Sequence, residues 1–188
     1  MAATHLQAGN GAGLGMTPGQ TTNLFASQSR FSQSSEAFVQ RTVRASGVAS
    51  KFWIRVTNND TTGNGTIRSR VNGANGNIVV TITLGTTGEF TDASNSDTLA
   101  ATDEYNFQSV NGTGGTDITV TLSSYVFTAD SNTYAIHSAF VAGLTSPAES
   151  TTYYQWPAGG FSTLSTTETD RQTLMRSAGT LKNGSISR

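Results

Sequence analysis

Cysteine is absent from this chain of 188 residues, and charged residues make up only 12% of it. Without cysteine the chain forms neither a disulfide framework nor a metal site built on thiolates. No run approaches the roughly 18 apolar residues of a membrane-spanning helix. The first twenty residues also lack the basic and apolar regions of a secretory signal. We therefore expect a protein that is made in the cytoplasm.

Helical sequence patterns are missing as well, since no segment keeps a 3.6-residue apolar period for three turns. Glycine (20 residues), serine, threonine and asparagine are abundant instead, which is typical of a β-protein with many turns. Short stretches of alternating apolar and polar residues recur along the middle of the chain. We predict an all-β protein whose main domain is an antiparallel β-sandwich of a jelly-roll-like kind.

Alternating residues locate the strands of this domain. Phe52, Ile54 and Val56 alternate with outward-facing residues, which is the period of a half-buried strand. The same pattern predicts that Leu84 faces inward at the end of a later strand. The strands expected on these grounds are 51–56, 66–71, 77–84, 89–91, 105–110, 117–127 and 134–141.

Turn and bulge signals accompany these strands. Asn72 and Gly73 favour the positive φ angles of a tight hairpin. Towards the end of the strand 117–127, Tyr125 and Phe127 are out of phase with the apolar residues before them. This change of phase predicts a β-bulge or a change of face.

Three parts are expected along the chain: an extended arm at 1–34, the β-sandwich domain at 35–145 and a C-terminal β extension at 146–188. Closely spaced glycines between Gly11 and Gly19 exclude a helix in the arm. A leader so rich in glycine and polar residues is expected to be disordered unless something orders it. We therefore expect a partner surface to hold it.

The C-terminal extension resembles the start of a second copy of residues 31–56. With a constant offset of 132 positions, the segment 161–188 shares these identities with it: Glu36 and Glu168, Gln40 and Gln172, Arg44 and Arg176, Gly47 and Gly179, and Ile54 and Ile186. Neighbouring repeats complete one another's packing. A copy that begins and does not finish leaves strands without a sheet of their own, which favours assembly over catalysis. A piece of a longer tandem array is the alternative.

Charge is distributed in blocks. Residues 30–70 contain seven basic and two acidic residues, residues 71–170 contain ten acidic residues and no basic one, and residues 171–188 contain four basic residues. The first basic block can neutralise the acidic stretch after it, whereas the second has no such stretch. Opposite charges steer association. We expect the basic tail of one subunit to lie on the acidic body of the next, with purely solvated charge blocks as the alternative.

Catalytic and metal-binding patterns are scarce. The two histidines, His5 and His137, have no second histidine or cysteine at ligand spacing, and no serine lies in a nucleophile-elbow motif. A group of acidic residues fits no calcium-loop spacing and is interpreted as turn residues that bond to their own backbone. We expect no catalytic residue, no cofactor and no metal, and hence no enzyme. The acidic group comprises Asp92, Asp97, Asp103 and Glu104.

Aromatic residues outside the core pattern offer a binding surface. Trp53 should face outward, and Tyr153, Tyr154 and Trp156 lie just before the second copy. Such side chains bind sugar faces or bury in protein interfaces, and they can equally cap the open end of their own sandwich. We prefer an interface for Tyr154 and Trp156. Nucleic acid is a poor partner, because basic residues are few beside so acidic a body.

The turns and strands resemble a known family. The segments Arg70–Asn77, Gly85–Asp92 and Asp103–Phe107 look like the β-sandwich repeats of virion structural proteins from tailed bacteriophages and of related bacterial repeat proteins. The likeness covers residues 36–128 and, more weakly, 161–188. It implies a capsid-decorating or fibre-type structural role, with assembly in the host cytoplasm.

These observations favour a non-enzymatic structural subunit of a phage virion, which decorates a capsid or forms another part of the head or tail. It would contact copies of itself and other virion proteins through its arm and C-terminal strands. An extracellular filament or adhesin subunit joined by strand exchange is the alternative, and a carbohydrate-binding module that binds a glycan is a more distant one. The residues expected at the assembly interface are Tyr154, Trp156, Arg171, Leu174, Met175, Arg176, Leu181, Lys182, Ile186 and Arg188.

Overall fold

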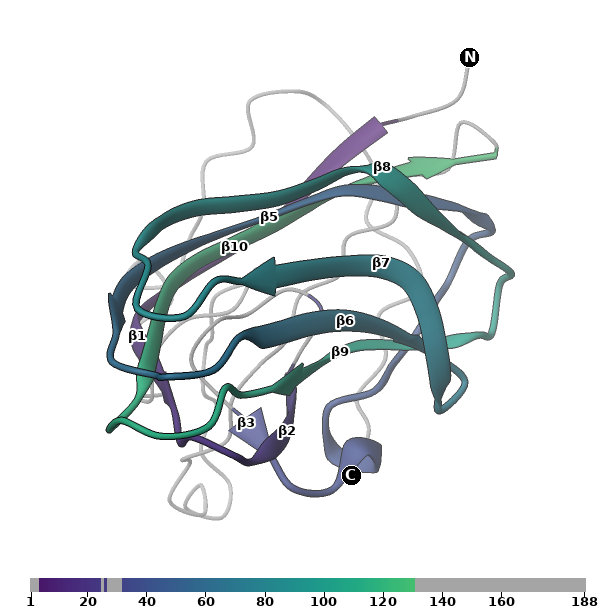
Figure 1. The fold of residues 1–188 in the computed structure, drawn as a ribbon. Helices are drawn as coiled ribbons and strands as arrows, with labels where there is room; N and C mark the ends of the chain where they lie inside the picture. The colour runs from purple at the N-terminus through teal and green to yellow at the C-terminus, as the bar shows by residue number, and fades with distance from the viewer. Residues whose placement is uncertain (1–3, 25, 27–31, 131–188) are drawn as a thin grey trace, which may run out of the picture. The chain divides into compact units, whose positions relative to one another are not determined.

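Two antiparallel β-sheets face each other in the computed structural model, which describes residues 4–24, 26 and 32–130 (Figure 1). The predicted all-β sandwich is therefore confirmed. Four long strands form the first sheet, sheet A. Their order across the sheet is β1 (Thr4–Met16), β10 (Ile118–Ala129), β5 (Gly47–Asn59) and β8 (Gly88–Leu99).

The second sheet, sheet B, mixes long and short strands. Its order is β3 (Ser32–Gln33), β2 (Thr21–Leu24), β9 (Glu104–Val110), β6 (Gly65–Val71) and β7 (Ala74–Ile82). A further short strand, β4 (Arg41–Thr42), pairs with the beginning of β9, and a single turn of 3-10 helix, η1 (Glu36–Phe38), lies between β3 and β4.

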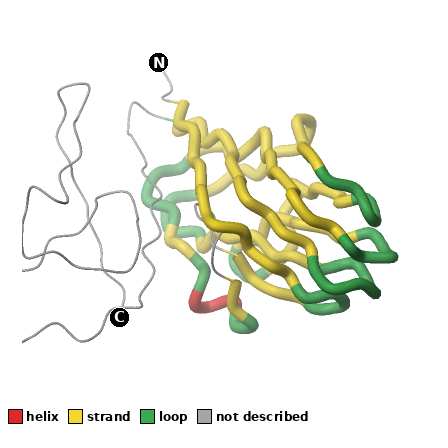
Figure 2. Tube along the Cα trace, turned by 90° about the vertical axis from the view of Figure 1, so that its left-hand side faces the viewer, coloured by secondary structure: helices red, strands yellow, loops and turns green. Residues whose placement is uncertain are grey.

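The order of the long strands identifies the sandwich as a jelly roll. When the two-residue strands β3 and β4 are left out, every connection between consecutive strands passes from one sheet to the other, except the hairpin that joins β6 to β7 within sheet B. This path places β1 beside β10 and β2 beside β9, so the first and last strands of the described chain are neighbours. Two Greek keys wound in this way are the double-sheet jelly roll, and Figure 2 shows its connecting loops, in green, at the ends of the strands.

The expected N-terminal arm supplies two strands of the sandwich. Residues 4–16 pair with β10 in sheet A, and residues 21–24 pair with β9 in sheet B. The segment is extended, but main-chain hydrogen bonds to its own domain hold it, where a partner surface was expected to do so. Alternation could not reveal β1, because much of it is glycine and alanine. Such a strand forms because β10 presents an edge to it.

Local turn chemistry follows the sequence closely. Asn72 has a φ angle of 52° and Gly73 one of 76°, and these two residues alone join β6 to β7. A two-residue turn in which both φ angles are positive matches the right-handed twist of the hairpin strands. The prediction of a tight hairpin at this Asn-Gly pair is confirmed.

Irregular pairing changes the inward phase of β10. Tyr125 and Phe127 are both fully buried, as are Ile118 and Val120 earlier in the strand. Residues of odd and even number share one face only if the strand contains a bulge, and the register of β10 against β5 shifts after Val120 and again after Ser124. The predicted bulge is confirmed.

An aromatic cluster fills the space between the sheets. Phe52 of β5 stacks on Phe107 of β9 with ring centroids 4.2 Å apart, and Tyr105 and Tyr125 lie against Phe107 with centroids 5.5 and 5.8 Å away. Phe52, Ile54 and Val56 all face this core, as their alternation predicted. Leu84 does not: β7 ends at Ile82, and Leu84 is half exposed in the turn that follows.

Candidate assembly surface

The residues predicted to form the assembly interface lie outside the part of the chain that the structure describes, and so does the strand expected at 134–141. They are Tyr154, Trp156, Arg171, Leu174, Met175, Arg176, Leu181, Lys182, Ile186 and Arg188. The described part offers the other half of such a contact, namely the sheet edges that a strand could join. A sandwich of two sheets has four edges, and they differ in how their backbone groups are used.

Two carboxylates close the side of the sandwich where the edge strands β7 and β8 run side by side. Asp92 of β8 accepts a hydrogen bond from the backbone N–H of Val79 at 2.9 Å, and Asp97 accepts one from the N–H of Asn77 at 2.6 Å. The side-chain amide of Asn77 in turn donates to the carbonyl of Ser96 at 3.1 Å. These amides lie on the strand that ends sheet B, so side chains of sheet A take the place of a further strand.

Asp92 is held as an anion by its donors. Burial alone would raise the pKa of this carboxyl, whose residue is only 6% exposed, but hydrogen bonds from Val79 and Asn95, with another from the Ser94 N–H, outweigh it and lower the pKa to about 2. A carboxylate that accepts several N–H bonds is stabilised in its charged form. Asp92 thus closes the sheet edge and folds its own β8 segment around itself.

Asp97 connects the closed edge to the core. Its second oxygen lies 3.4 Å from the hydroxyl of Tyr105, and burial raises the pKa of that hydroxyl well above its ordinary value. Gly76 passes so close that an added Cβ would lie 2.8 Å from the Asp97 carboxylate and closer still to the Ser69 hydroxyl. Glycine is needed here because of this approach.

The interpretation of the acidic residues as turn residues is right for Asp103 and incomplete for the two on β8. Asp103 accepts a hydrogen bond from the Ala100 N–H at 2.7 Å within its own turn. Asp92 and Asp97 lie inside a strand of twelve residues, where three had been expected. They bond across to β7 because the sandwich brings that edge to them, and the sequence of β8 alone does not contain β7.

Short strands and a crossing segment cover the opposite edge of sheet B. β3 pairs with β2, and β4 pairs with β9 beyond the end of β2. Asn23 of β2 donates to the carbonyl of Ser34 at 3.1 Å and accepts from Gln108 at 3.0 Å, which ties the segment between β3 and β4 to the sheet. Very short edge strands with a covering loop protect a sheet against further pairing.

The same segment carries an ion pair. Arg70 of β6 binds Glu36 of η1 through two hydrogen bonds, of 2.8 and 3.1 Å, and also donates to Asn75 and to the carbonyl of Gly73. The hydrogen bond from Arg70 lowers the pKa of Glu36. Both partners belong to the first basic block, 30–70, so this block neutralises part of itself.

One residue of the first basic block does reach the acidic stretch. Burial lowers the pKa of the Arg41 guanidinium, and the charge of Glu104 raises it in part. Glu104 also accepts a hydrogen bond from Thr42 at 2.7 Å. Contact between the two charge blocks is thus made where β4 pairs with β9.

The remaining edge is the outer side of β1. This strand of thirteen residues pairs with β10 on one side and with no strand of the described chain on the other. Its residues, Thr4–Met16, include no Asp, Glu, Lys, Arg or Pro. A register shift between Asn10 and Leu14 interrupts it, which leaves Thr4–Asn10 as a regular stretch of seven residues. It contains none of the charges and prolines that usually block an edge, and no described element covers it.

Carboxylates lie at both ends of the β1–β10 pair. At one end Asn58 donates to Asp60 at 3.2 Å and to Asp117 at 2.9 Å, and Thr116 donates to Asp60 at 2.7 Å. The hydrogen bond from Thr116, followed by that from Asn58, lowers the pKa of Asp60. At the other end Asp130 follows β10. None of these three carboxylates forms an ion pair with a described residue.

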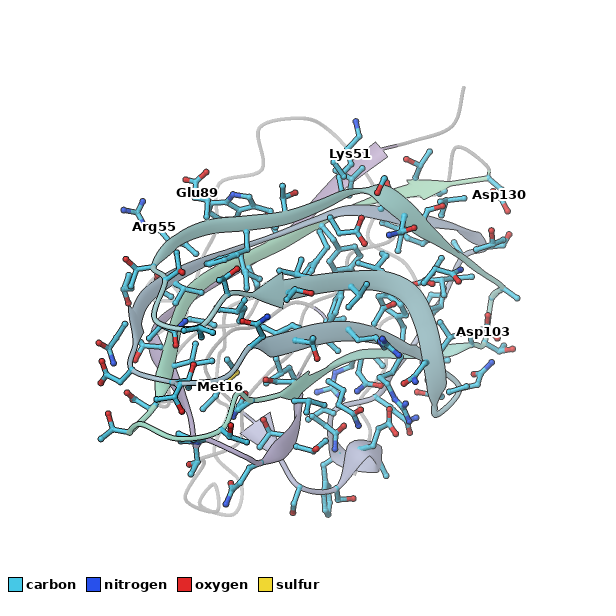
Figure 3. The ribbon with its side chains drawn as sticks, viewed as in Figure 1. Met16, Lys51, Arg55, Glu89, Asp103 and Asp130 are labelled. Carbon is cyan, nitrogen blue, oxygen red and sulfur yellow. The ribbon has the colours of Figure 1, made fainter. Side chains whose placement is uncertain are left out.

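The outward face of sheet A carries a second set of charges (Figure 3). Trp53 of β5 faces outward as predicted, and its indole N–H lies 3.3 Å from a carboxylate oxygen of Glu89. Lys51 and Arg55 on the same strand are exposed, and Lys51 sits at the β5 irregularity with a φ angle of 53°. Charges of both signs on this face give it the character of a solvated surface.

Catalytic geometry does not stand out in the described chain. No group of three or more His, Asp or Glu side chains gathers there to hold a metal ion. His5 lies in β1, and His137 lies outside the described residues. No described helix is long and apolar enough to cross a membrane.

Comparison with protein-family models finds no match to this chain, and no curated protein matches it. The surface must therefore be interpreted from its own chemistry. Two features were missed in the sequence: the open edge of β1 and the carboxylate-closed edge at β7. The complete lack of charge before Arg30 is the one sequence signal that could have singled out β1.

Proposed function

We propose that this chain is a non-enzymatic structural subunit of a large assembly, a phage virion protein that decorates a capsid or forms another part of the head or tail. The observation that carries the proposal is the strand order of the double-sheet jelly roll, an architecture that viral capsid proteins use. The fold alone is an analogy, because one fold serves many functions. The sheet edges supply the physical argument.

Assembly by strand addition suits the described edges. A strand that joins a sheet gains main-chain hydrogen bonds along its whole length, and side chains on alternate positions give specificity. The closed edges at β7 and β2, and the contact of β8 with β7, favour β1 as the edge that such a partner joins. The apolar residues Leu174, Met175, Leu181 and Ile186, together with Tyr154 and Trp156, remain the residues proposed to bury in a neighbour.

Light scattering on the purified full chain tests the assembly. We expect a mass well above the 19.7 kDa of one chain, which falls when the four basic residues after position 170 are replaced by glutamine. The matched control replaces Lys51 and Arg55 by glutamine, which removes positive charge from the outer face of sheet A and should leave the mass unchanged. A mass of one chain at every protein concentration would contradict the proposal.

Electron microscopy of particles from the source of the gene tests the virion role. Gold-labelled antibody against the chain should decorate phage heads or tails and leave the cell surface free. Label on cell-surface filaments would instead favour an extracellular filament or adhesin subunit. Glycan binding that is lost in Trp156→Ala would favour a lectin, since jelly-roll sandwiches also occur in lectins.

A further inference from the structure

We infer that the outer edge of β1, over Thr4–Asn10, is the acceptor for a strand from the C-terminal tail, residues 171–188, of a second copy of the chain. This rests on the proposed function and names the surface through which that assembly forms. Such a contact is head-to-tail, because the tail of each copy meets a different surface on the next. Heterologous contacts of this kind build rings or filaments according to the rotation between subunits.

The sheet edges differ in how far their backbone groups are already used. Carboxylates of Asp92 and Asp97 already occupy backbone amides of β7, and β3 covers β2. β8, the other edge strand of sheet A, lies beside β7, and its Ser96 carbonyl already accepts from the Asn77 side chain. The outer edge of β1 has no such contact with another described strand. Seven residues in regular register at Thr4–Asn10 offer about as many positions as a mean strand of five to six residues uses.

Charge selects the occupant. β1 contains no charged residue that would repel a partner strand. Asp60, Asp117 and Asp130 lie at the ends of the β1–β10 pair, and none of them forms an ion pair with a described residue. The tail contains four basic residues and no acidic one. Complementary charges at the two ends of a strand fix its register more than they add affinity.

Spacing along the strands agrees with this pairing. Asp117 and Asp130 are thirteen positions apart (130 − 117), about 43 Å at ~3.3 Å per residue of extended chain. In the tail, Arg176 and Arg188 are twelve positions apart (188 − 176), about 40 Å on the same scale. The long arginine side chains cover the small difference. The two spacings thus match along the strand direction over the whole β1–β10 pair, of which Thr4–Asn10 is the regular part.

Disulfide trapping tests the contact in the full chain, which contains no cysteine of its own. One tagged copy carries Ala8→Cys, and a second copy with a different tag carries one cysteine in the tail, at Thr173, Ser177 or Thr180 in turn. After mild oxidation we expect a product that contains both tags for at least one tail position, since Cα atoms of paired strands lie within disulfide range. In the control, Thr98→Cys at an exposed position of β8 replaces Ala8→Cys, and we expect no product that contains both tags.

Adjacent proline variants supply a test that separates folding from assembly. Consecutive backbone N–H groups of a strand point to opposite edges, so one of Gln7→Pro and Ala8→Pro removes a hydrogen bond to β10 and the other removes only an outward donor. We expect one variant to lower the melting temperature. The other should keep it while association weakens about tenfold, through the lost inter-chain bond.

Each outcome decides something. A product that links Ala8→Cys to itself would assign the edge to a β1–β1 contact, and a link within one chain carrying both cysteines would assign it to the chain's own tail; either overturns the inference. If the chain assembles normally but no tail cysteine is trapped, the inference is overturned and the proposed function is left intact. The same holds if both proline variants assemble normally. A chain that stays monomeric throughout overturns both.

Discussion

The edge of the sandwich at β7 and the edge at β1 treat their backbone groups in opposite ways. Along β7, amides that no strand pairs with donate to the carboxylates of Asp92 and Asp97 and are no longer available. Along β1, no side chain is shown to bond to the outer amides and carbonyls in the described chain, and the strand carries no charge that would repel a partner. Within the described chain, one edge is thus blocked by carboxylates and another is left without a paired strand.

The difference shows how a sandwich directs its contacts. A row of unpaired backbone groups invites pairing with any other chain, so a subunit that assembles through one edge gains specificity by blocking the rest. Charged side chains that point into the gap between sheets are one such block. The cost is a set of buried carboxylates that must keep all their donors.

The largest effect is expected for Asp97→Ala at the blocked edge. The change leaves the Asn77 N–H and the buried Tyr105 hydroxyl without their acceptor, and we expect the free energy of unfolding to fall by about 3 kcal/mol. Urea denaturation measures it, with Asp130→Ala, an exposed carboxylate after β10, as the matched control. A loss no larger than in the control would show that the edge at β7 does not depend on Asp97.

A methyl group at Gly76 probes the same edge from the side of β7. In Gly76→Ala the new Cβ would meet the Asp97 carboxylate and the Ser69 hydroxyl, and overpacking of this kind should lower the free energy of unfolding by about 2 kcal/mol. Thr81→Ala, at an exposed position of the same strand, should change it little. Equal stability of the two variants would indicate that β7 and β8 have room to separate.

Acid titration sharpens the role of Asp92. Its pKa lies at about 2 in the folded chain against an ordinary value of 3.8, so its ionised form stabilises the fold above about pH 4 and this contribution is lost as the pH falls through 2. Asp92→Asn should lower the free energy of unfolding by about 1 to 2 kcal/mol at pH 7. Measured against pH, the gap between wild type and variant should close between pH 4 and pH 2. A gap that stays constant contradicts the assignment.

The smallest effect is expected in the turn after β8, which touches neither edge and serves as a reference. Thr102 has a φ angle of 85°, which a β-branched residue rarely adopts. Thr102→Gly should therefore raise the free energy of unfolding by about 1 kcal/mol, seen as a higher melting temperature. Ala101→Gly, the neighbouring change at a residue without a positive φ, should not. Association of the full chain should be the same in both variants.

Much of the sandwich could be predicted because local pattern and tertiary burial agree. The inward faces of β5 and β7 follow from Phe52, Ile54 and Ile78, which alternate with polar or outward-facing neighbours and are fully or almost fully buried. The hairpin at Asn72 and Gly73 follows from the backbone freedom of those residues. These features depend on a few neighbouring residues, and short-range sequence determines them.

Prediction was poorest where a residue's partner lies far away in the chain. β1 lacks an apolar alternation and becomes a strand by pairing with β10, more than 100 positions later. The β8 carboxylates looked like turn residues, since nothing near them in sequence shows that β7 amides face them. Leu84 was predicted inward by continuing a pattern past the point where the hairpin partner β6 ends.

By itself, the sequence determined the class of the protein, its short strands, its tight turns and the separation of charge into blocks. All of these arise from the propensity and spacing of nearby residues. Only the tertiary structure decided which strands became neighbours, which edge the carboxylates closed and which edge stayed open. Those outcomes depend on hydrogen bonds between segments that meet only after the two Greek keys are wound, and such bonds leave no local trace in the chain.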